Sequence, residues 1–373
     1  MWNAIKALFI KDIKITLRNR ALLVASILIP VVFIFLYSLV VQISATTPIV
    51  IARESQGSHS NSFVKILTEM SSVDGPYFEI QTFDSAVAFE KYKQKKVGAL
   101  IEIPSSFDSD IAQGLKPKVN LYIHNINSDS TKNYQLRLSH TIYAFQNDLQ
   151  PEISIIESYS KFPQDIPVKL YVAIALLMFT VIYASMVNTG ILITREWEER
   201  TGKEISLTPK GFLPFVVGKW ITAFVQTIIS TVLVCIIMYF TLGFSFAYIT
   251  PAVFLILLVM FLFGASLGAW IGSYFRKTVP MVSFSGVICL FIFLICGNES
   301  ALRGMADSSL PKVLWEISKY IPISHITENI RQLIVFPDSG IYWAPVFWTV
   351  LISICFAFIS IRQLKKVIYQ HGQ

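Results

Sequence analysis

The stretch ALLVASILIPVVFIFLYSLVVQIS, residues Ala21–Ser44, contains no charged side chain. A bilayer core about 30 Å thick is crossed by roughly 20 apolar residues in an α-helix. The stretch therefore predicts a membrane-spanning helix, in which Pro30 is tolerated as a kink. The next uninterrupted segment of this length, Tyr171–Thr194, begins only after a polar segment of over a hundred residues.

Four more apolar segments follow, and the composition agrees with a membrane protein. Hydrophobic residues make up 54% of the chain and charged residues 15%, against about 45–50% and 25% in soluble domains. We expect an α-helical membrane protein with six transmembrane helices, at about Ala21–Ile43 (the first span, 21–43), Leu170–Ile193, Trp220–Leu242, Pro251–Tyr274, Val279–Ile295 and Tyr342–Ile361.

Basic residues predict which side each short segment faces. Five lie before the first span, five in the loop between spans two and three, two in the turn between spans four and five, and three after the last span. The connection Gly243–Thr250 has no charge. The positive-inside rule then places both termini in the cytoplasm. This placement also explains the net charge of +7 without a nucleic-acid partner.

The polar segment 44–167 reads as a folded domain inserted between spans one and two. Short apolar runs such as Pro48–Ala52 and Val97–Ile103 alternate with helical patterns, which predicts a small extracytoplasmic α/β domain with a partly parallel sheet. His124 and His140 have no spaced metal partner, so we expect neither a metal site nor catalysis.

Several classes of function are disfavoured. The span interiors contain no Asp, Glu, Lys, Arg or His, whereas ion-coupled carriers usually place such residues along the transport path. The sequence Gly211-Phe-Leu-Pro-Phe-Val-Val-Gly218-Lys219 separates its glycines by six residues, and Trp220 stands where a phosphate loop has Ser or Thr. We therefore expect no nucleotide site in this chain, and we expect no other cofactor site in it.

Two cytoplasmic segments are candidates for contact with a partner. Residues 1–20 form an amphipathic helix that we expect at the membrane interface. After span two, the segment 195–209 predicts a charged helix, in which Glu196 and Arg200 share a face.

This segment resembles that of type-2 ABC exporter permeases, which carry R-E-x-E-x-x-T, then a Leu, a T-P pair and a G-K pair. The matching residues are Arg195, Glu196, Glu198, Thr201, Leu207, Thr208, Pro209, Gly218 and Lys219. Gly202-Lys203 departs from the pattern. The resemblance extends along nearly the whole chain and favours the subfamily with a large periplasmic or extracellular insert after the first span.

The resemblance implies that 195–209 is a coupling helix seated in a groove of a separate ATP-binding subunit, which binds ATP and magnesium. Trp197 would be its anchor and the N-terminal helix Trp2–Leu17 a second contact. A second permease copy or paralogue completes the pathway, membrane lipid surrounds it, and a periplasmic adaptor is a further candidate partner. The implied location is a bacterial cytoplasmic (inner) membrane. The charged and polar residues expected at the ATPase contact are Arg195, Glu196, Glu198, Arg200, Thr201 and Lys219.

Two further groups of residues are structural candidates within 168–361. Gly264, Gly268 and Gly272 recur every four residues, which lets helix backbones approach closely. The segment 297–341 is too long for a turn, and by resemblance it holds outward-facing re-entrant helices with Pro311, Pro322 and Arg331 as gate residues. A tail, 362–373, follows.

The resemblance implies efflux of an amphipathic or envelope-related molecule, such as a drug or lipid, without identifying it. Two alternatives stay open. One is a receptor or structural membrane protein whose outer domain binds a partner, and the other is an ion-coupled carrier.

Overall fold

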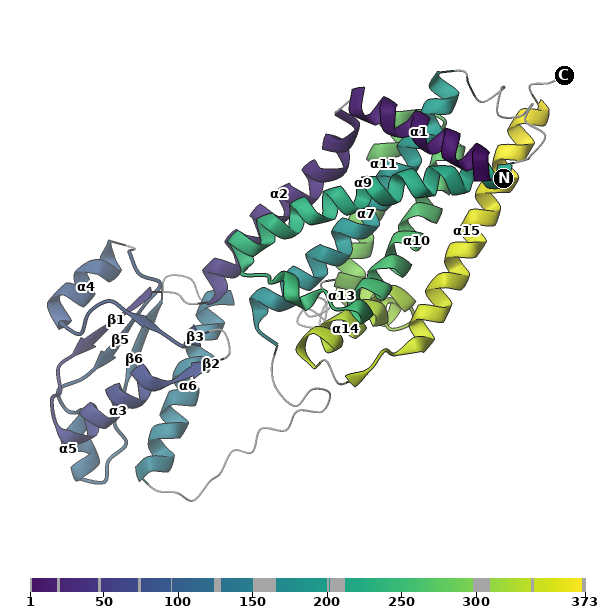
Figure 1. The fold of residues 1–373 in the computed structure, drawn as a ribbon. Coiled ribbons are helices and arrows are strands. Elements are labelled where there is room, and N and C mark those ends of the chain that lie inside the picture. Colours follow the sequence, from purple (N-terminus) through teal and green to yellow (C-terminus); the bar gives the residue numbers. More distant parts are fainter. Residues whose placement is uncertain are drawn as a thin grey trace. The chain divides into compact units, whose positions relative to one another are not determined.

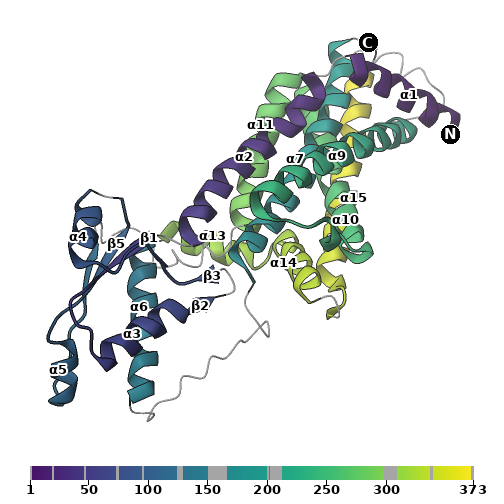
Figure 2. The same ribbon diagram turned by 60° about the vertical axis from the view of Figure 1, so that its left-hand side comes forward.

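The computed structural model describes residues 2–18, 21–45, 48–72, 75–94, 96–123, 129–149, 166–199, 201, 212–297, 309–336 and 339–370. The chain divides into two compact units, Met1–Ser38 with Lys169–Gln373, and Leu39–Val168. Each unit is described separately below (Figures 1 and 2).

The first unit is built from helices. Among the described residues, five helices are long and apolar enough to cross a membrane, and Val24–Ser38 adds a shorter apolar segment. These segments correspond to the six predicted spans, so the prediction of an α-helical membrane protein is confirmed. The helices of this unit are α1 (Trp2–Arg18), α2 (Ala21–Ala45, up to Ser38), α7 (Val168–Glu198), α9 (Phe212–Leu242), α10 (Pro251–Phe275), α11 (Thr278–Ile292), α13 (Ser309–Ser318), α14 (Pro322–Val335) and α15 (Trp343–Gln370), with a 3₁₀ turn at Phe246–Tyr248 and a π-helical turn at Phe293–Gly297.

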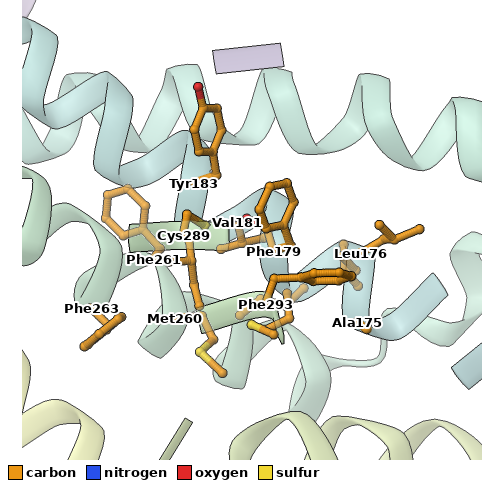
Figure 3. Packing of buried hydrophobic residues seen from close by; sticks show 14 of the residues in the cluster. Ala175, Leu176, Phe179, Val181, Tyr183, Met260, Phe261, Phe263, Cys289 and Phe293 are labelled. Carbon is orange, nitrogen blue, oxygen red and sulfur yellow. Dashed lines mark hydrogen bonds between the residues drawn. The ribbon is translucent and has the colours of Figure 1, made fainter. Parts of the chain in front are cut away.

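Helix α7 forms the centre of this unit. Every residue from Ala173 to Thr194 is buried, so α7 is surrounded by protein on all sides, as expected of a helix that is hydrophobic all round. Phe179 of α7 packs against Phe293, with ring centroids 5.3 Å apart (Figure 3). The centroid of the Phe179 ring also lies 4.9 Å from that of Phe33 in α2. Aromatic packing thus joins α2, α7 and the end of α11.

The predicted glycine stripe lies where α10 packs on α7. A Cβ at Gly264 would lie 2.0 Å from Ser185 Oγ, and one at Gly268 would lie 2.1 Å from the carbonyl oxygen of Met186. At Gly272 the nearest atom is the carbonyl oxygen of Gly190, at 3.0 Å. The first two positions therefore have no room for any side chain, and the two backbones are in direct contact.

The second unit has a four-stranded sheet in the order β4-β1-β5-β6, in which β1 pairs parallel with β4 and β5, and β6 is antiparallel to β5. A separate hairpin, β2-β3, completes the strands. The elements are β1 (Pro48–Arg53), α3 (Ser58–Glu69), β2 (Ser71–Ser72), β3 (Gly75–Pro76), β4 (Glu79–Ile80), α4 (Ser85–Lys93), β5 (Ala99–Ile103), α5 (Phe107–Ala112), β6 (Asn120–Ile123) and α6 (Asp129–Leu149).

Both faces of this sheet are covered, which explains the unbroken apolar run in β1. Ile49 and Ile51 face the cluster that includes Phe63 of α3 and Phe145 of α6, whose rings lie 5.3 Å apart. Val50, on the opposite face, packs in the cluster of α4. Figure 2 shows α3 beside α6. The extracytoplasmic location expected for this unit stays a prediction.

The start of α3 is capped from another element. Its own N-cap residue, Gly57, has no side chain to supply the bond. Asp108 of α5 instead accepts hydrogen bonds from the backbone N–H groups of Gly57, His59 and Ser60 at 3.1, 2.9 and 3.1 Å, and from the Ser55 hydroxyl. Partial burial acts to raise the pKa of Asp108, but these bonds outweigh it and lower the pKa to about 2.

Candidate functional site

A cluster of four charged residues lies where α1, α7 and α9 meet. Lys219 Nζ of α9 donates to Asp12 Oδ1 of α1 at 2.8 Å and to Glu196 Oε1 of α7 at 2.6 Å. Lys11 Nζ donates to both Glu196 oxygens at 2.9 Å. Only 1% of Lys219, 2% of Asp12 and 3% of Glu196 is exposed. These three buried residues, together with Lys11, whose side chain is 37% exposed, are called the buried charge cluster below.

Local sequence explains why α1 and α9 come this close. Gly218 precedes Lys219, and a Cβ at Gly218 would lie 3.2 Å from Leu8 Cβ, so a larger residue would push α1 away. Further along the contact, Gln226 Nε2 of α9 donates to Thr16 Oγ1 of α1 at 2.7 Å. Both helices are thus held along several turns, and Figure 1 shows α1 beside α9.

The cluster balances two cations against two anions. Burial raises the pKa of Asp12, and the neighbouring Lys219 offsets this effect in part. Within the described part of the chain, the second oxygen of Asp12, Oδ2, is buried and has no hydrogen-bond partner. A buried ion pair contributes little net stability, but removing one partner costs about 3–5 kcal/mol because the other charge is left unpaired. The cluster therefore fixes the register of three helices.

The two residues after Glu196 bind the turn between α10 and α11. Glu198 accepts hydrogen bonds from the backbone N–H and the hydroxyl of Thr278, both at 2.8 Å, and so caps the first turn of α11. The Trp197 ring lies 5.9 Å from the Arg276 guanidinium, close enough for a cation–π contact. Of three consecutive side chains of α7, Glu196 thus contacts α1 and α9, while Trp197 and Glu198 contact the junction of α10 and α11.

Apolar packing brings the last helix to the same place. Ile193 of α7, Phe215 of α9, Ala269 of α10 and Leu364 of α15 form one buried cluster, against which Trp197 packs. The final turn of α7 is therefore the point where α1, α9, α10, α11 and α15 meet. We call this end of α7, residues Thr194–Glu198, the hub.

The structure separates the predicted site residues into two groups. Arg195 pairs with Glu199 at the surface, whereas Glu196, Trp197 and Glu198 make the contacts within the chain described above. The Thr201 hydroxyl donates to Glu196. Arg200 and residues 202–209 of the predicted coupling helix lie outside the described residues, so the contact of 195–209 with an ATP-binding subunit stays a prediction.

Asp12 is a site residue that the sequence analysis did not identify. The sequence does contain an indication that Asp12 is special, because it is the only acidic residue among the first twenty. The basic residues around it predicted only an amphipathic helix at the membrane interface. Lys219 was predicted at the contact with the ATP-binding subunit, whereas the structure buries it within the chain as the cation shared by two carboxylates.

Arg331, a predicted gate residue, lies at the opposite end of α7. It is fully buried in α14, where its Nη1 lies 3.2 Å from Glu328 Oε2 and its guanidinium 3.5 Å from the centre of the Tyr171 ring. Pro322 is the first residue of α14. Pro311 lies in α13, and its side chain lies outside the described residues.

The structure shows two local ion pairs among the charged residues in and beside α13 and α14. Glu316 pairs with Lys319 in and just after α13, and Glu328 with Arg331 in α14, each three residues apart. Within the described ranges, no group of three His, Cys, Asp or Glu side chains could hold a metal ion.

Comparison with known protein families matches residues 20–362 to the family described as ABC-2 family transporter protein. The match covers more than nine-tenths of the chain and includes both units and the hub. A search of curated proteins finds no match.

Proposed function

Because the chain belongs to the ABC-2 transporter family, whose members are membrane subunits of transporters, we propose that it is the permease of an ATP-driven exporter. ATP hydrolysis takes place in a separate subunit, which binds ATP and magnesium. Family members normally work with such an ATP-binding subunit. The chain itself contributes the transport pathway and the helix contacts through which the ATP-binding subunit changes that pathway.

The hub is the observation that supports this proposal. A transporter driven by a separate ATPase needs one place where a displacement at the membrane surface reaches many helices. The end of α7 meets this need, since Glu196 is bonded to α1 and α9 while Glu198 is bonded to α11. The charged segment 195–209 begins here. A push on that segment acts on all these helices together.

The hub residues have different roles in this proposal. Arg195 and Glu199 are at least partly exposed and continue into the segment that contacts the ATPase, together with Arg200. Glu196 and Lys219 act inside the permease, because their charges are already satisfied within the chain. Trp197 is half-buried, so its exposed part contributes to the docking surface while its ring is held by Arg276.

The distribution of charge supports the orientation. Lys11, Arg195, Lys219 and Arg276 come from separate segments, and the contacts of the hub gather all of them at one end of the helical unit. By the positive-inside rule this end is cytoplasmic. The unit Leu39–Val168 is then extracytoplasmic, and the protein lies in the inner membrane of a bacterium.

The substrate class and the assembly extend the proposal. Two permease copies, or one copy and a paralogue, form the pathway. The cargo is an amphipathic or envelope-related molecule that leaves the cytoplasm or the inner leaflet. A periplasmic adaptor would contact the unit Leu39–Val168.

The test is a charge-removing substitution inside the hub with a matched control on an exposed carboxylate elsewhere. Glu196→Gln keeps the size of the side chain but removes the charge that Lys11 and Lys219 share. Glu69→Gln makes the same chemical change in the unit Leu39–Val168, where the Glu69 side chain is 66% exposed. In membranes with the ATP-binding subunit, we expect Glu196→Gln to lower transport at least about tenfold while ATP hydrolysis continues. We expect Glu69→Gln to retain transport within about threefold.

Two results would overturn the proposal. The first is equal transport by Glu196→Gln and the unaltered chain, with equal dependence on ATP. The second is transport that continues with a hydrolysis-deficient ATP-binding subunit but stops when ion gradients are collapsed, which would favour the ion-coupled carrier.

A further inference from the structure

Helix α1 carries a stripe of large apolar and basic side chains that no part of the described structure covers. Trp2, Lys6, Ile10, Lys14 and Arg18 recur every four residues and are all exposed. Residues four apart lie on one face of a helix. The exposed fraction is 70% for Trp2 and 42% for Ile10, and Leu17 beside them is 67% exposed. These six residues are called the α1 stripe.

The opposite face of α1 packs against the rest of the helical unit. Ile5, Asp12 and Thr16 are buried, and the last two bond to Lys219 and Gln226 of α9. The α1 stripe is therefore the face that remains for a partner. Its charge is entirely positive, since Asp12 is the only acidic residue in the first twenty and lies on the packed face.

The position of α1 decides what kind of partner reaches the stripe. Helix α2 and its apolar segment begin at Ala21, three residues after α1 ends. On its packed side, α1 contacts α9 from Gly218 to Gln226, inside the candidate span Pro214–Leu242. Helix α1 therefore lies beside the starts of two apolar helices, which is where we expect the headgroups of a membrane. Trp and Lys or Arg are the residues that membrane interfaces favour.

We infer that the α1 stripe binds anionic phospholipid headgroups, with Trp2, Ile10 and Leu17 inserted at the acyl boundary and Lys6, Lys14 and Arg18 paired with phosphates. One basic side chain near an anionic bilayer surface contributes a factor of about five in binding. Three such residues give a marked preference for anionic over zwitterionic lipid, and salt reduces it.

This site is connected to the buried charge cluster through α1 itself. Lys11 and Asp12 lie between Ile10 and Lys14, on the turn that the lipid would hold. Headgroup binding therefore fixes the helix that presents Asp12 to Lys219. This consequence rests on the proposed function, and we expect ATP-driven transport to require anionic lipid, whereas the binding itself does not depend on the ATPase.

The binding test uses the full permease chain alone in lipid nanodiscs. Tryptophan fluorescence is quenched with brominated phosphatidylglycerol or with brominated phosphatidylcholine at the same minor mole fraction. The fluorescence of Trp2 is obtained as the difference between the unaltered chain and Trp2→Phe, because the other six tryptophans are present in both. At low salt we expect Trp2 to be quenched about two- to fivefold more by the anionic lipid.

Matched triple variants separate the stripe from net charge. Lys6→Gln, Lys14→Gln and Arg18→Gln together should abolish the preference for anionic lipid. The control, Lys93→Gln, Lys116→Gln and Lys118→Gln, removes the same charge from exposed positions in the other unit and should retain the preference. All six substitutions are at the surface, where stability changes are usually within about 0.5 kcal/mol.

Equal quenching of Trp2 by the two brominated lipids would overturn the inference. A stripe variant that keeps the lipid preference but no longer binds the ATP-binding subunit would also overturn it, and would assign the stripe to that protein. If the lipid preference is found but Glu196→Gln transports normally, the proposed function fails while the lipid site stands.

Discussion

Replacing Lys219 by Met removes one charge from the buried charge cluster while keeping most of the side-chain volume. The substitution leaves Asp12 without its ion-pair partner and leaves Glu196 with Lys11 alone. The cluster then has one cation for two buried carboxylates. We expect the folded protein to lose about 3–5 kcal/mol, the usual cost of breaking a buried pair from one side.

An exposed pair of the same geometry provides the control. Lys319 Nζ lies 2.6 Å from Glu316 Oε1, the same separation as Lys219 Nζ from Glu196 Oε1. The Lys319 and Glu316 side chains are 43% and 52% exposed. Lys319→Met should therefore cost about 0–1 kcal/mol, because water screens and replaces the interaction. The difference between the two variants measures burial rather than ion-pair distance.

The pH dependence of Lys219→Met follows from Asp12. Burial already raises the pKa of Asp12, and Lys219 is the largest influence that lowers it, so the pKa rises further in the variant. The folded state then binds a proton more tightly than the unfolded state, and stability falls as pH rises. We expect the stability that Lys219→Met loses relative to the unaltered chain to become smaller as pH falls from 8 to 5. We expect Asp12→Asn, added to Lys219→Met, to restore about 2 kcal/mol or more of that stability.

The assay is thermal unfolding of the purified chain in detergent or nanodiscs, followed by loss of monodisperse protein. The reasoning would be refuted by equal melting temperatures for Lys219→Met and Lys319→Met. It would also be refuted by a double variant no more stable than Lys219→Met alone, since the unpaired Asp12 charge would then not be the cause.

Two further predictions concern packing and capping. Gly268→Ala should destabilise the helical unit by about 1–3 kcal/mol, because its Cβ would lie 2.1 Å from the carbonyl oxygen of Met186. Gly286→Ala, whose nearest neighbour would be 3.9 Å away, should be close to neutral in the same thermal measurement. Asp108→Ala should cost the unit Leu39–Val168 about 1 kcal/mol, the worth of a helix cap, as measured by chemical unfolding followed by Tyr and Phe signals or by limited proteolysis at Leu39–Val168. Folding lowers the pKa of Asp108 to about 2. The stability that Asp108 contributes is therefore present above the unfolded pKa near about 4 and disappears as pH falls toward about 2. A difference in stability between the unaltered chain and Asp108→Ala that stays constant from pH 5 to pH 2 would contradict the assignment.

Several features could be predicted from the sequence because they depend on short segments. A run such as Ala21–Ser44 has the length and composition of a span whatever packs around it. The apolar runs Pro48–Ala52 and Val97–Ile103 were predicted as strands for the same reason, since an apolar run bounded by turn residues suits a covered strand. The structure has strands there at Pro48–Arg53 and Ala99–Ile103. Gly264, Gly268 and Gly272 indicated close helix contact by their spacing alone.

The sequence alone could not show which buried charges meet. Asp12 and Lys219 are 207 residues apart, and Lys11 and Glu196 are 185 apart. Helical periodicity relates residues three or four positions apart, so it placed Glu196 with Arg200 and left Asp12 on a basic surface helix. Only the packing of α1 and α9 against the end of α7 brings these side chains out of water. Apolar length thus determined the membrane helices, whereas the pairing of distant charges was decided by tertiary structure, because a charge is stable in the interior only where folding supplies its partner.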